Sequence, residues 1–431
     1  MKQLFLPDDT VVNKVSYYHL ALFLIALPVD FFYSQLILVS FAIHSFIHAR
    51  KENYKNILSR PVLIIASLFL LNALAIAYSS DKPEGINVTT RQLAMLLFPV
   101  LFAINGLSLE KYRTRLFLVF GFTCVGTVLY LYAEAVRTIL FFGLKGSALF
   151  SSPFMNHNFS LPIGIHATYL SLYVAFSLIL FLYFIITKKR NTATLLYVFC
   201  SLVLLAGLIQ LSSRAVFIAL MLVINLGFTF YLFSGSKKWL FFLSSFLLSA
   251  ATVVLIWNVD SFKTRYVSEL KTDLTNNATL VENFEPRLAR WDAIGEIVKT
   301  SPLIGHGTGA EKKLLKEKYY EKGFYISYLN EFNTHNEYLS ILVKTGLMGL
   351  LLFLYVLYCG FASAFRQKDL LFLSFMIIIT VVSVSENILE LNKGIFFYAF
   401  FFSCFLGKPS PSPAVTPRLM KPGNPVVLKS V

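Results

Sequence analysis

The chain is a succession of long apolar runs separated by short polar intervals. An α-helix needs about 17–25 predominantly apolar residues to cross a bilayer, and Pro28 and Asp30 mark a turn between the first two runs. The pattern therefore predicts an all-α polytopic membrane protein with about 12 transmembrane helices. The predicted spans are 16–30, 32–48, 61–79, 91–106, 116–136, 166–187, 194–211, 215–233, 239–257, 337–359, 370–386 and 393–407.

One polar interval, residues 258–336, is far longer than the others. It holds eleven Lys/Arg and eleven Asp/Glu residues, so it is neutral, and long loops cross a membrane largely regardless of charge. We expect a periplasmic loop domain here, between helices 9 and 10. The predicted organisation is helices 1–9 in residues 1–257, the loop domain in 258–336, helices 10–12 in 337–407, and a proline-rich, disordered cytoplasmic tail in 408–431.

Composition agrees with this prediction. The chain is 56% hydrophobic and 14% charged, whereas soluble domains average about 45–50% and about 25%. The net charge of +15 comes largely from basic clusters in the short loops, the pattern of cytoplasmic loops under the positive-inside rule, so we expect no nucleic-acid partner. The four cysteines lie inside apolar runs, which indicates small core residues rather than disulfides.

Ionisable residues gather at the predicted outer ends of the spans, which weighs against a transporter with an ion path at the midplane. Arg214 stands between two spans with almost no loop, either near lipid headgroups or in a site. Arg287 and Arg290 are three residues apart on a predicted amphipathic helix, either as solvated charges or as a pair facing one way. Lys344, inside the tenth run, is expected to snorkel outward or to pair with Glu337.

The segment HNEYLSILVKTGLMG opens the tenth predicted span. Asn336 and Glu337 suit the first turn of a helix, as cap and as acidic residue. The spacing places His335 on one face with apolar residues, either as an interfacial histidine or as a functional one. Gly346 would let a neighbouring helix approach closely. The glycines of PLIGHGTG predict a tight turn, since the Lys-Ser/Thr of a phosphate-binding loop is missing.

Several motifs occur in a fixed order: GIHATYLSLY, an arginine after SS, R-x-x-x-W, PLIGHGTG and HNEYLSILVKTGLMG. Together with the large late loop, they resemble the O-antigen ligase and O-antigen polymerase superfamily, most closely the O-antigen ligases. The resemblance covers about residues 160–360.

The resemblance implies an enzyme of the bacterial inner membrane that takes a glycan from undecaprenyl diphosphate at the periplasmic face. Ligases transfer it to lipid A–core, polymerases to another lipid-linked repeat unit, and a related branch to protein hydroxyls. The implied transfer needs neither a metal ion nor a cofactor, and its partners are the donor, the acceptor and membrane lipids. A glycolipid flippase or transporter is the alternative from another class.

By the same resemblance, Arg214 and Arg287 hold the donor diphosphate, with Arg290 as an alternative to Arg287, and His335 is the catalytic residue, as general base or as the residue that positions the acceptor. Paired guanidinium donors suit phosphate oxygens, and histidine is the usual base near neutral pH. The outer loops contain no Asp-x-Asp element or clustered carboxylates of the kind that hold Mg²⁺. Residues of secondary importance are His166, Tyr169 and Asn336.

Overall fold

A computed structural model describes residues 7–189, 191–258, 260–273 and 285–407. These residues form helices and loops, and no strand occurs among them. Among the described residues, eight helices are long and apolar enough to cross a membrane, and four shorter apolar helices bring the number of apolar helices to the expected twelve. The all-α membrane architecture is therefore confirmed. The predicted tail, 408–431, and part of the predicted loop domain lie outside the described residues.

The apolar helices follow the predicted order closely. Asp30 caps the second apolar helix, α3 (Phe31–Ile47), by accepting a hydrogen bond from the Phe32 amide, so the expected division of the first long run is confirmed. The elements of these spans are α2 (Val11–Ala26), α3 (Phe31–Ile47), α4 with η2 (Arg60–Ala75, Ile76–Tyr78), α5 with α6 (Lys82–Gln92, Ala94–Ile104), α7 (Leu109–Phe141), α9 (Ala167–Thr187), α10 (Thr192–Leu211), α11 with η6 and α12 (Arg214–Leu222, Val223–Phe228, Thr229–Leu232), α13 (Gly235–Asn258), α19 (Glu337–Gln367), α20 (Leu370–Val382) and α21 (Asn392–Leu406).

The centre of the bundle is an aromatic core around α21. Phe401 of α21 lies 4.8 Å from the ring of Phe176 on α9 and 5.0 Å from that of Phe117 on α7. Lipid tails are as apolar as these side chains, so close packing rather than the hydrophobic effect favours their association. At the periphery, only 6% of the apolar stretch of α13 is buried in the protein, which leaves most of its surface for lipid. The four cysteines are free and buried, as expected.

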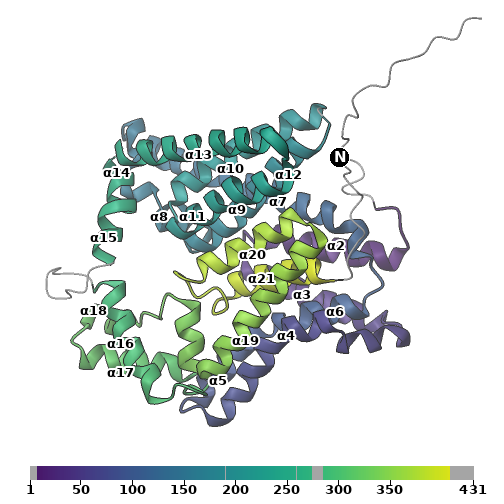
Figure 1. The fold of residues 1–431 in the computed structure, drawn as a ribbon, viewed down its shortest axis with the longest axis vertical. Helices are drawn as coiled ribbons and strands as arrows, with labels where there is room; N and C mark the ends of the chain where they lie inside the picture. The colour runs from purple at the N-terminus through teal and green to yellow at the C-terminus, as the bar shows by residue number, and fades with distance from the viewer. Residues whose placement is uncertain (1–6, 190, 259, 274–284, 408–431) are drawn as a thin grey trace, which may run out of the picture.

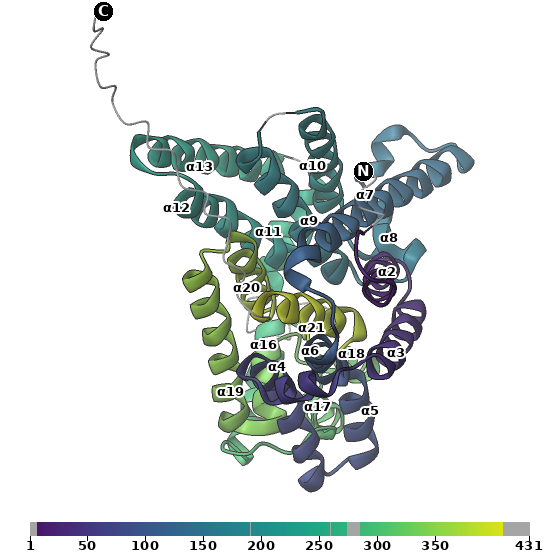
Figure 2. The ribbon, with the colours of Figure 1, turned by 90° about the vertical axis from the view of Figure 1, so that its right-hand side faces the viewer.

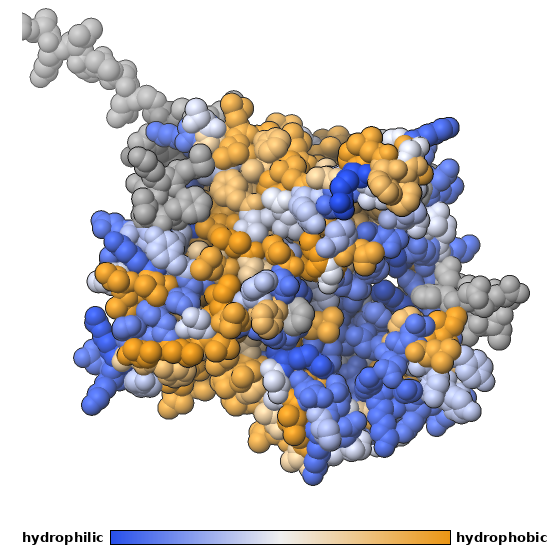
Figure 3. Space-filling view, turned by 180° about the vertical axis from the view of Figure 1, so that it is seen from behind, coloured by the Kyte–Doolittle hydropathy of each residue, from blue (hydrophilic) through white to orange (hydrophobic). Residues whose placement is uncertain are grey.

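Smaller helices gather at one end of the bundle. They are η3 (Gly146–Phe150), η4 (Ser152–Phe154), α8 (His157–Ser160), η5 (Leu161–Ile163), α14 (Asp260–Lys263), η7 (Thr264–Ser268), α15 (Glu269–Asp273), α16 (Arg287–Thr300), α17 (Ala310–Glu321) and α18 (Tyr325–Leu329). In Figure 1, α14 to α18 lie at the left and the start of α2 lies at the right. Hydrophobic residues form a band between two more hydrophilic ends in Figure 3. η1 (Lys51–Leu58) belongs to the end that carries the start of α2.

Helix α16 packs as its pattern predicts. Ala289, Ala293 and Ile294 are buried in a small core that also includes Val343 of α19, and Trp291 packs against its edge. The indole of Trp291 donates a hydrogen bond of 2.9 Å to the Thr334 carbonyl. This second core attaches the loop helices to the beginning of α19.

Candidate functional site

His335 precedes α19 rather than forming part of it. Its φ of +44° lies in the left-handed region, and its amide donates to Asn333 Oδ1 over 3.0 Å. The next residue, Asn336, is the true cap, because its side chain accepts from the Leu339 amide at 3.1 Å. The expectation that His335 continues the apolar face of the helix is therefore wrong. The backbone enters the helix only after two non-helical residues, since Asn336 is extended with φ −163° and ψ 110°.

The loop between α20 and α21 holds this turn in place. Asn387 Oδ1 accepts from the Asn336 amide at 2.8 Å and from the Thr334 hydroxyl at 3.0 Å. Glu337 is buried and accepts from the Leu389 amide at 2.8 Å. Because each of these bonds joins the start of α19 to the last loop, the position of His335 depends on that loop.

Glu386, in the same loop, is the acidic partner of His335. Its Oε2 lies 3.5 Å from His335 Nδ1, and its Oε1 accepts from the Thr168 hydroxyl at 3.4 Å. Burial raises the pKa of this carboxyl, but the interaction with His335 and the charges of His166 and Arg287 outweigh burial and lower it below its usual value. Glu386 therefore stays ionised and can orient the imidazole through Nδ1.

Two further histidines lie against this pair. The ring centroids of His157 and His166 are 4.0 Å apart, and the Ala167 amide donates to His157 Nδ1 at 3.3 Å. Burial lowers the pKa of His157 to about 4, helped by the nearby charges of His166 and Arg265. Burial also lowers the pKa of His166, against the opposing effect of Glu386. Burial therefore favours the uncharged form of both rings.

Tyr169 connects the first turn of α9 to the last loop. Its hydroxyl donates 2.9 Å to the Asn387 carbonyl, and its side chain is buried. Its ring centroid lies 5.7 Å from that of His166. Tyr169 thus fixes the same loop that presents Glu386.

The two arginines singled out in the sequence converge on one carboxylate. Arg214, the first residue of α11, places Nη2 2.6 Å from Asp273 Oδ2, and Arg287 Nε lies 3.8 Å from the same oxygen. Arg287 Nη1 also donates to the Ser385 carbonyl at 3.3 Å, beside Glu386. Residues from α11, α15, α16 and the last loop therefore meet at one point.

Arg290 takes a different position from Arg287. Its side chain is buried, and its guanidinium carbon lies 5.1 Å from the ring centroid of Phe332. Burial lowers the pKa of Arg290, and the positive charge of Arg287 adds to this. The three-residue spacing therefore does not direct both arginines the same way: Arg287 reaches the last loop, whereas Arg290 packs in the core of the loop helices.

Several buried polar atoms of this cluster lack a hydrogen-bond partner within the described residues: Arg214 Nη1, His166 Nδ1, His335 Nδ1 and Asn387 Nδ2. Buried polar groups are normally paired, because leaving one unpaired costs about 1–3 kcal/mol. A cluster of such atoms beside charged side chains is typical of a site that a ligand completes.

The glycines of PLIGHGTG have a structural role that the turn prediction missed. Gly346 interrupts α19 with φ +62°, and the loop pairs with the broken helix. His306 and Gly307 amides donate to the Val343 and Lys344 carbonyls at 2.8 Å each. In return the Pro302 and Leu303 carbonyls accept from the Leu347 and Met348 amides at 2.8 and 3.2 Å. The expected approach of a neighbouring helix at Gly346 is instead an approach of this loop.

Lys344 neither snorkels outward nor pairs with Glu337. It is buried, with Nζ 3.0 Å from Glu311 Oε2 and 2.5 Å from Glu390 Oε2. Arg91 Nη2 extends the network, 3.4 Å from Glu390 Oε1. The network ties α17 and α5 to α19 and the last loop, close to the turn that carries His335.

The comparison with protein families follows the same segments. Residues 199–354 match a family model described as O-antigen ligase. The resemblance predicted from the motifs is confirmed over these residues. No curated protein sequence matches the chain.

The O-antigen ligase match includes Arg214, Arg287, Arg290 and His335 and excludes His166 and Tyr169. It indicates a glycosyltransferase-like membrane enzyme of the O-antigen ligase or polymerase type. Sequence reasoning missed Glu386, which also lies beyond the match. The signal available for it was the polar stretch SENILELN, but the predicted span 370–386 included its first two residues, whereas α20 ends at Val382.

Proposed function

We propose that this protein is an O-antigen ligase of the bacterial inner membrane. It would transfer a glycan from undecaprenyl diphosphate to lipid A–core at the periplasmic face, without a resident metal ion. The observation that carries the proposal is the convergence of Arg214 and Arg287 on one anionic group, beside the His335–Glu386 pair. The family match supports the class of enzyme.

The orientation in the membrane follows from charge. The basic clusters near Arg50, Lys111, Lys189 and Arg366 lie at the ends of helices remote from His335. Since basic loops stay in the cytoplasm, the site faces the periplasm. Residues 258–336 would then form the periplasmic domain, and donor glycans displayed on that side would reach the site directly.

The arginines would bind the donor diphosphate. Asp273 holds both guanidinium groups at present, so its carboxylate marks the place where an anion binds. A diphosphate would replace it or share the two arginines with it, and Arg214 Nη1 supplies a further donor. As the bond from the anomeric carbon to the diphosphate oxygen breaks, its electron pair stays on the leaving group, and the two cations stabilise that charge.

His335 would act on the acceptor. Glu386 faces Nδ1, which leaves Nε2 as the nitrogen that takes the proton of the acceptor hydroxyl. The deprotonated oxygen forms the new bond to the anomeric carbon while the diphosphate leaves. His166 and Tyr169 are secondary in this scheme: they shape the wall of the site and fix the last loop.

Transfer by purified protein tests the proposal. The full chain, undecaprenyl diphosphate-linked glycan and lipid A–core are incubated with EDTA, and glycosylated core is measured on a gel. We expect transfer by the wild type and a loss of about 10²–10³-fold in Arg214→Ala, the usual effect of removing one donor to a developing anion. The matched control is Arg137→Ala, an exposed arginine paired with Glu134.

Each negative result would refute a different part of the proposal. Absence of transfer to any acceptor in EDTA would refute the metal-free enzyme, and undiminished transfer by His335→Ala would refute the base assignment alone. Gene deletion separates the acceptors: loss of a ligase leaves bare core with polymer still on its carrier, whereas loss of a polymerase leaves core with one repeat.

A further inference from the structure

A cavity of about 1530 Å³ lies at the opposite end of the bundle from His335. It is bounded by η1, the loop before α7, and the ends of α4, α6, α19 and α21. Figure 2 views the bundle from this end, with these four helices labelled. Pockets for drug-sized ligands occupy about 300–1,000 Å³. This cavity therefore has room for more than a small anion.

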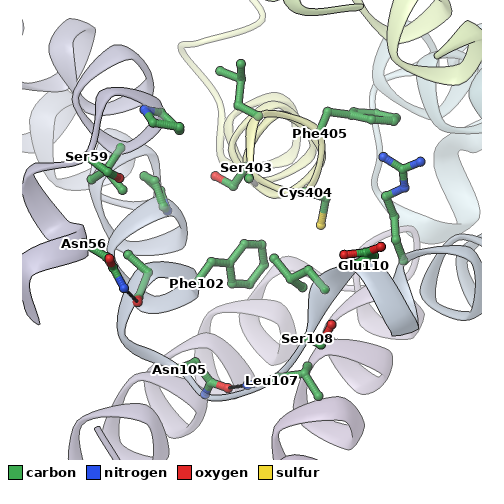
Figure 4. A pocket seen from close by; sticks show the side chains of 18 of the residues that line it. Asn56, Ser59, Phe102, Asn105, Leu107, Ser108, Glu110, Ser403, Cys404 and Phe405 are labelled. Atoms are coloured by element: carbon green, nitrogen blue, oxygen red, sulfur yellow. Dashed lines mark hydrogen bonds between the residues drawn. The ribbon is translucent and has the colours of Figure 1, made fainter. Parts of the chain in front are cut away.

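Polar and apolar groups share the lining. Figure 4 shows Asn56, Ser108 and Glu110 around the same space as Phe102 and Cys404. The apolar residues belong to membrane helices; they include Val62, Ile64, Ile65, Pro99, Phe102 and Leu406. A ligand that fits both surfaces has a polar head and an apolar body.

The charge of the lining is predominantly positive, with four arginines and one lysine against Glu52 and Glu110. Lys111 lies 3.2 Å from Asp9 and is already paired. Arg50 and Arg366 are both exposed, and neither has an ion-pair partner among the described residues. These two guanidinium groups are thus available to an anion. The lining arginines are Arg50, Arg60, Arg113 and Arg366.

Ser403 gives a second indication of a ligand. Its side chain is buried on α21 and lines the cavity, and its hydroxyl lacks a hydrogen-bond partner within the described ranges. A buried hydroxyl without a partner is destabilising unless something else in the cavity accepts or donates. Tyr358, which is exposed, also lines the cavity, as expected for an aromatic residue at the membrane interface.

We propose that this cavity binds the phosphate headgroup of an anionic membrane phospholipid. Arg50 and Arg366 take the phosphate oxygens, because planar guanidinium groups donate paired hydrogen bonds to them. The acyl chains lie along the apolar wall formed by α4, α6 and α21. The basic end of the bundle faces the cytoplasm by the positive-inside rule, so the lipid comes from the cytoplasmic leaflet. This site is separate from the glycan-transfer site.

Native mass spectrometry of the full chain, purified in detergent and stripped of lipid, tests the proposal with phosphatidylglycerol. We expect one tightly bound lipid, and a loss of about tenfold or more in affinity in the double variant Arg50→Ala, Arg366→Ala, since two charge-assisted contacts are removed. The matched control is Lys189→Ala, Lys237→Ala. It removes two exposed positive charges outside the cavity, one after α9 and one in the first turn of α13, and should bind as the wild type does.

Equal affinity in the wild type and the double variant would overturn the proposal, as would the absence of a tightly bound lipid. A parallel titration with soluble glycerol phosphate separates a free phosphate from a lipid, and binding as tight as that of phosphatidylglycerol would refute the lipid assignment. The variant Arg50→Lys, Arg366→Lys keeps the charge, loses the paired donors and should bind with intermediate affinity. Glycan transfer is assayed independently of lipid binding. A failed lipid-binding test therefore does not refute the glycan-transfer site, and a failed transfer assay does not refute the lipid site.

Discussion

The buried network around Lys344 allows one prediction to be worked out in detail. The side chain of Lys344 is only 5% exposed, and those of its partners Glu311 and Glu390 are 8% and 18% exposed. Replacing the lysine by methionine leaves two carboxylates in a poorly solvated place without their shared cation. Removal of one partner from a buried ion pair costs about 3–5 kcal/mol.

The lower end of that range applies to Lys344→Met. Glu390 keeps a second cation, since Arg91 lies 3.4 Å away, so Glu311 suffers most from the change. We expect the free energy of unfolding to fall by about 3 kcal/mol. The double variant Lys344→Met, Glu311→Gln also removes the uncompensated charge. Because the two sites are coupled, its loss of unfolding free energy should be smaller than the sum of the two single losses by at least about 1 kcal/mol.

Equilibrium unfolding in mixed micelles of a mild detergent and dodecyl sulfate measures these differences. Lys312→Met is the control: its partner Glu331 is 2.6 Å away, but Lys312 is 57% exposed, so the change should stay within about 0.5 kcal/mol. A Lys344→Met protein as stable as this control would refute the reasoning. So would a double variant whose loss equals the sum of the two single losses.

Three further predictions concern the backbone break and the histidine cluster. Gly346→Ala should lower the free energy of unfolding by more than about 2 kcal/mol, which is roughly the strain of a positive φ alone, because the added Cβ would also lie 2.4 Å from Leu303 backbone atoms. The control Gly126→Ala has open space around its Cβ and should not destabilise the protein. Acidification from pH 6.5 to 4 should destabilise the wild type, because His157 is protonated in the unfolded chain but stays neutral in the folded protein over most of this range. In thermal melts, His157→Asn should lose less stability than the wild type over the same pH range. Glu386→Gln should keep the fold but lower glycan transfer at least tenfold, since the His335 imidazole loses its ionised partner; unchanged transfer across pH 6 to 8 would contradict this.

The membrane helices were predictable because each one is encoded locally. An apolar run of sufficient length has to span the bilayer or be buried, whatever surrounds it, and the polar residues on either side fix its ends. The same holds for α16, which the sequence predicts as an amphipathic helix and whose Ala289, Ala293 and Ile294 are buried. These features need no knowledge of distant residues.

The site is less local, and the sequence showed only part of it. The positive φ of His335 depends on Asn333 and on a loop some fifty residues further along, so helical spacing could not predict its direction. Glu386 was missed for the same reason: nothing near it in the chain indicates that it faces His335. Lys344 was assigned the wrong partners, because Glu311 and Glu390 approach it from the loop helices and the last loop.

The break at Gly346 has a consequence for the order of assembly in the membrane. The Val343 and Lys344 carbonyls and the Leu347 and Met348 amides find their partners in residues 302–307. Backbone groups without partners are unstable at membrane depth, so α19 reaches its final shape only with that segment already in place. In the proposed orientation, translocation of the long loop therefore precedes completion of the tenth apolar helix. A chain split within residues 274–284 keeps both segments on one fragment and preserves that order, whereas a split between 309 and 333 separates them.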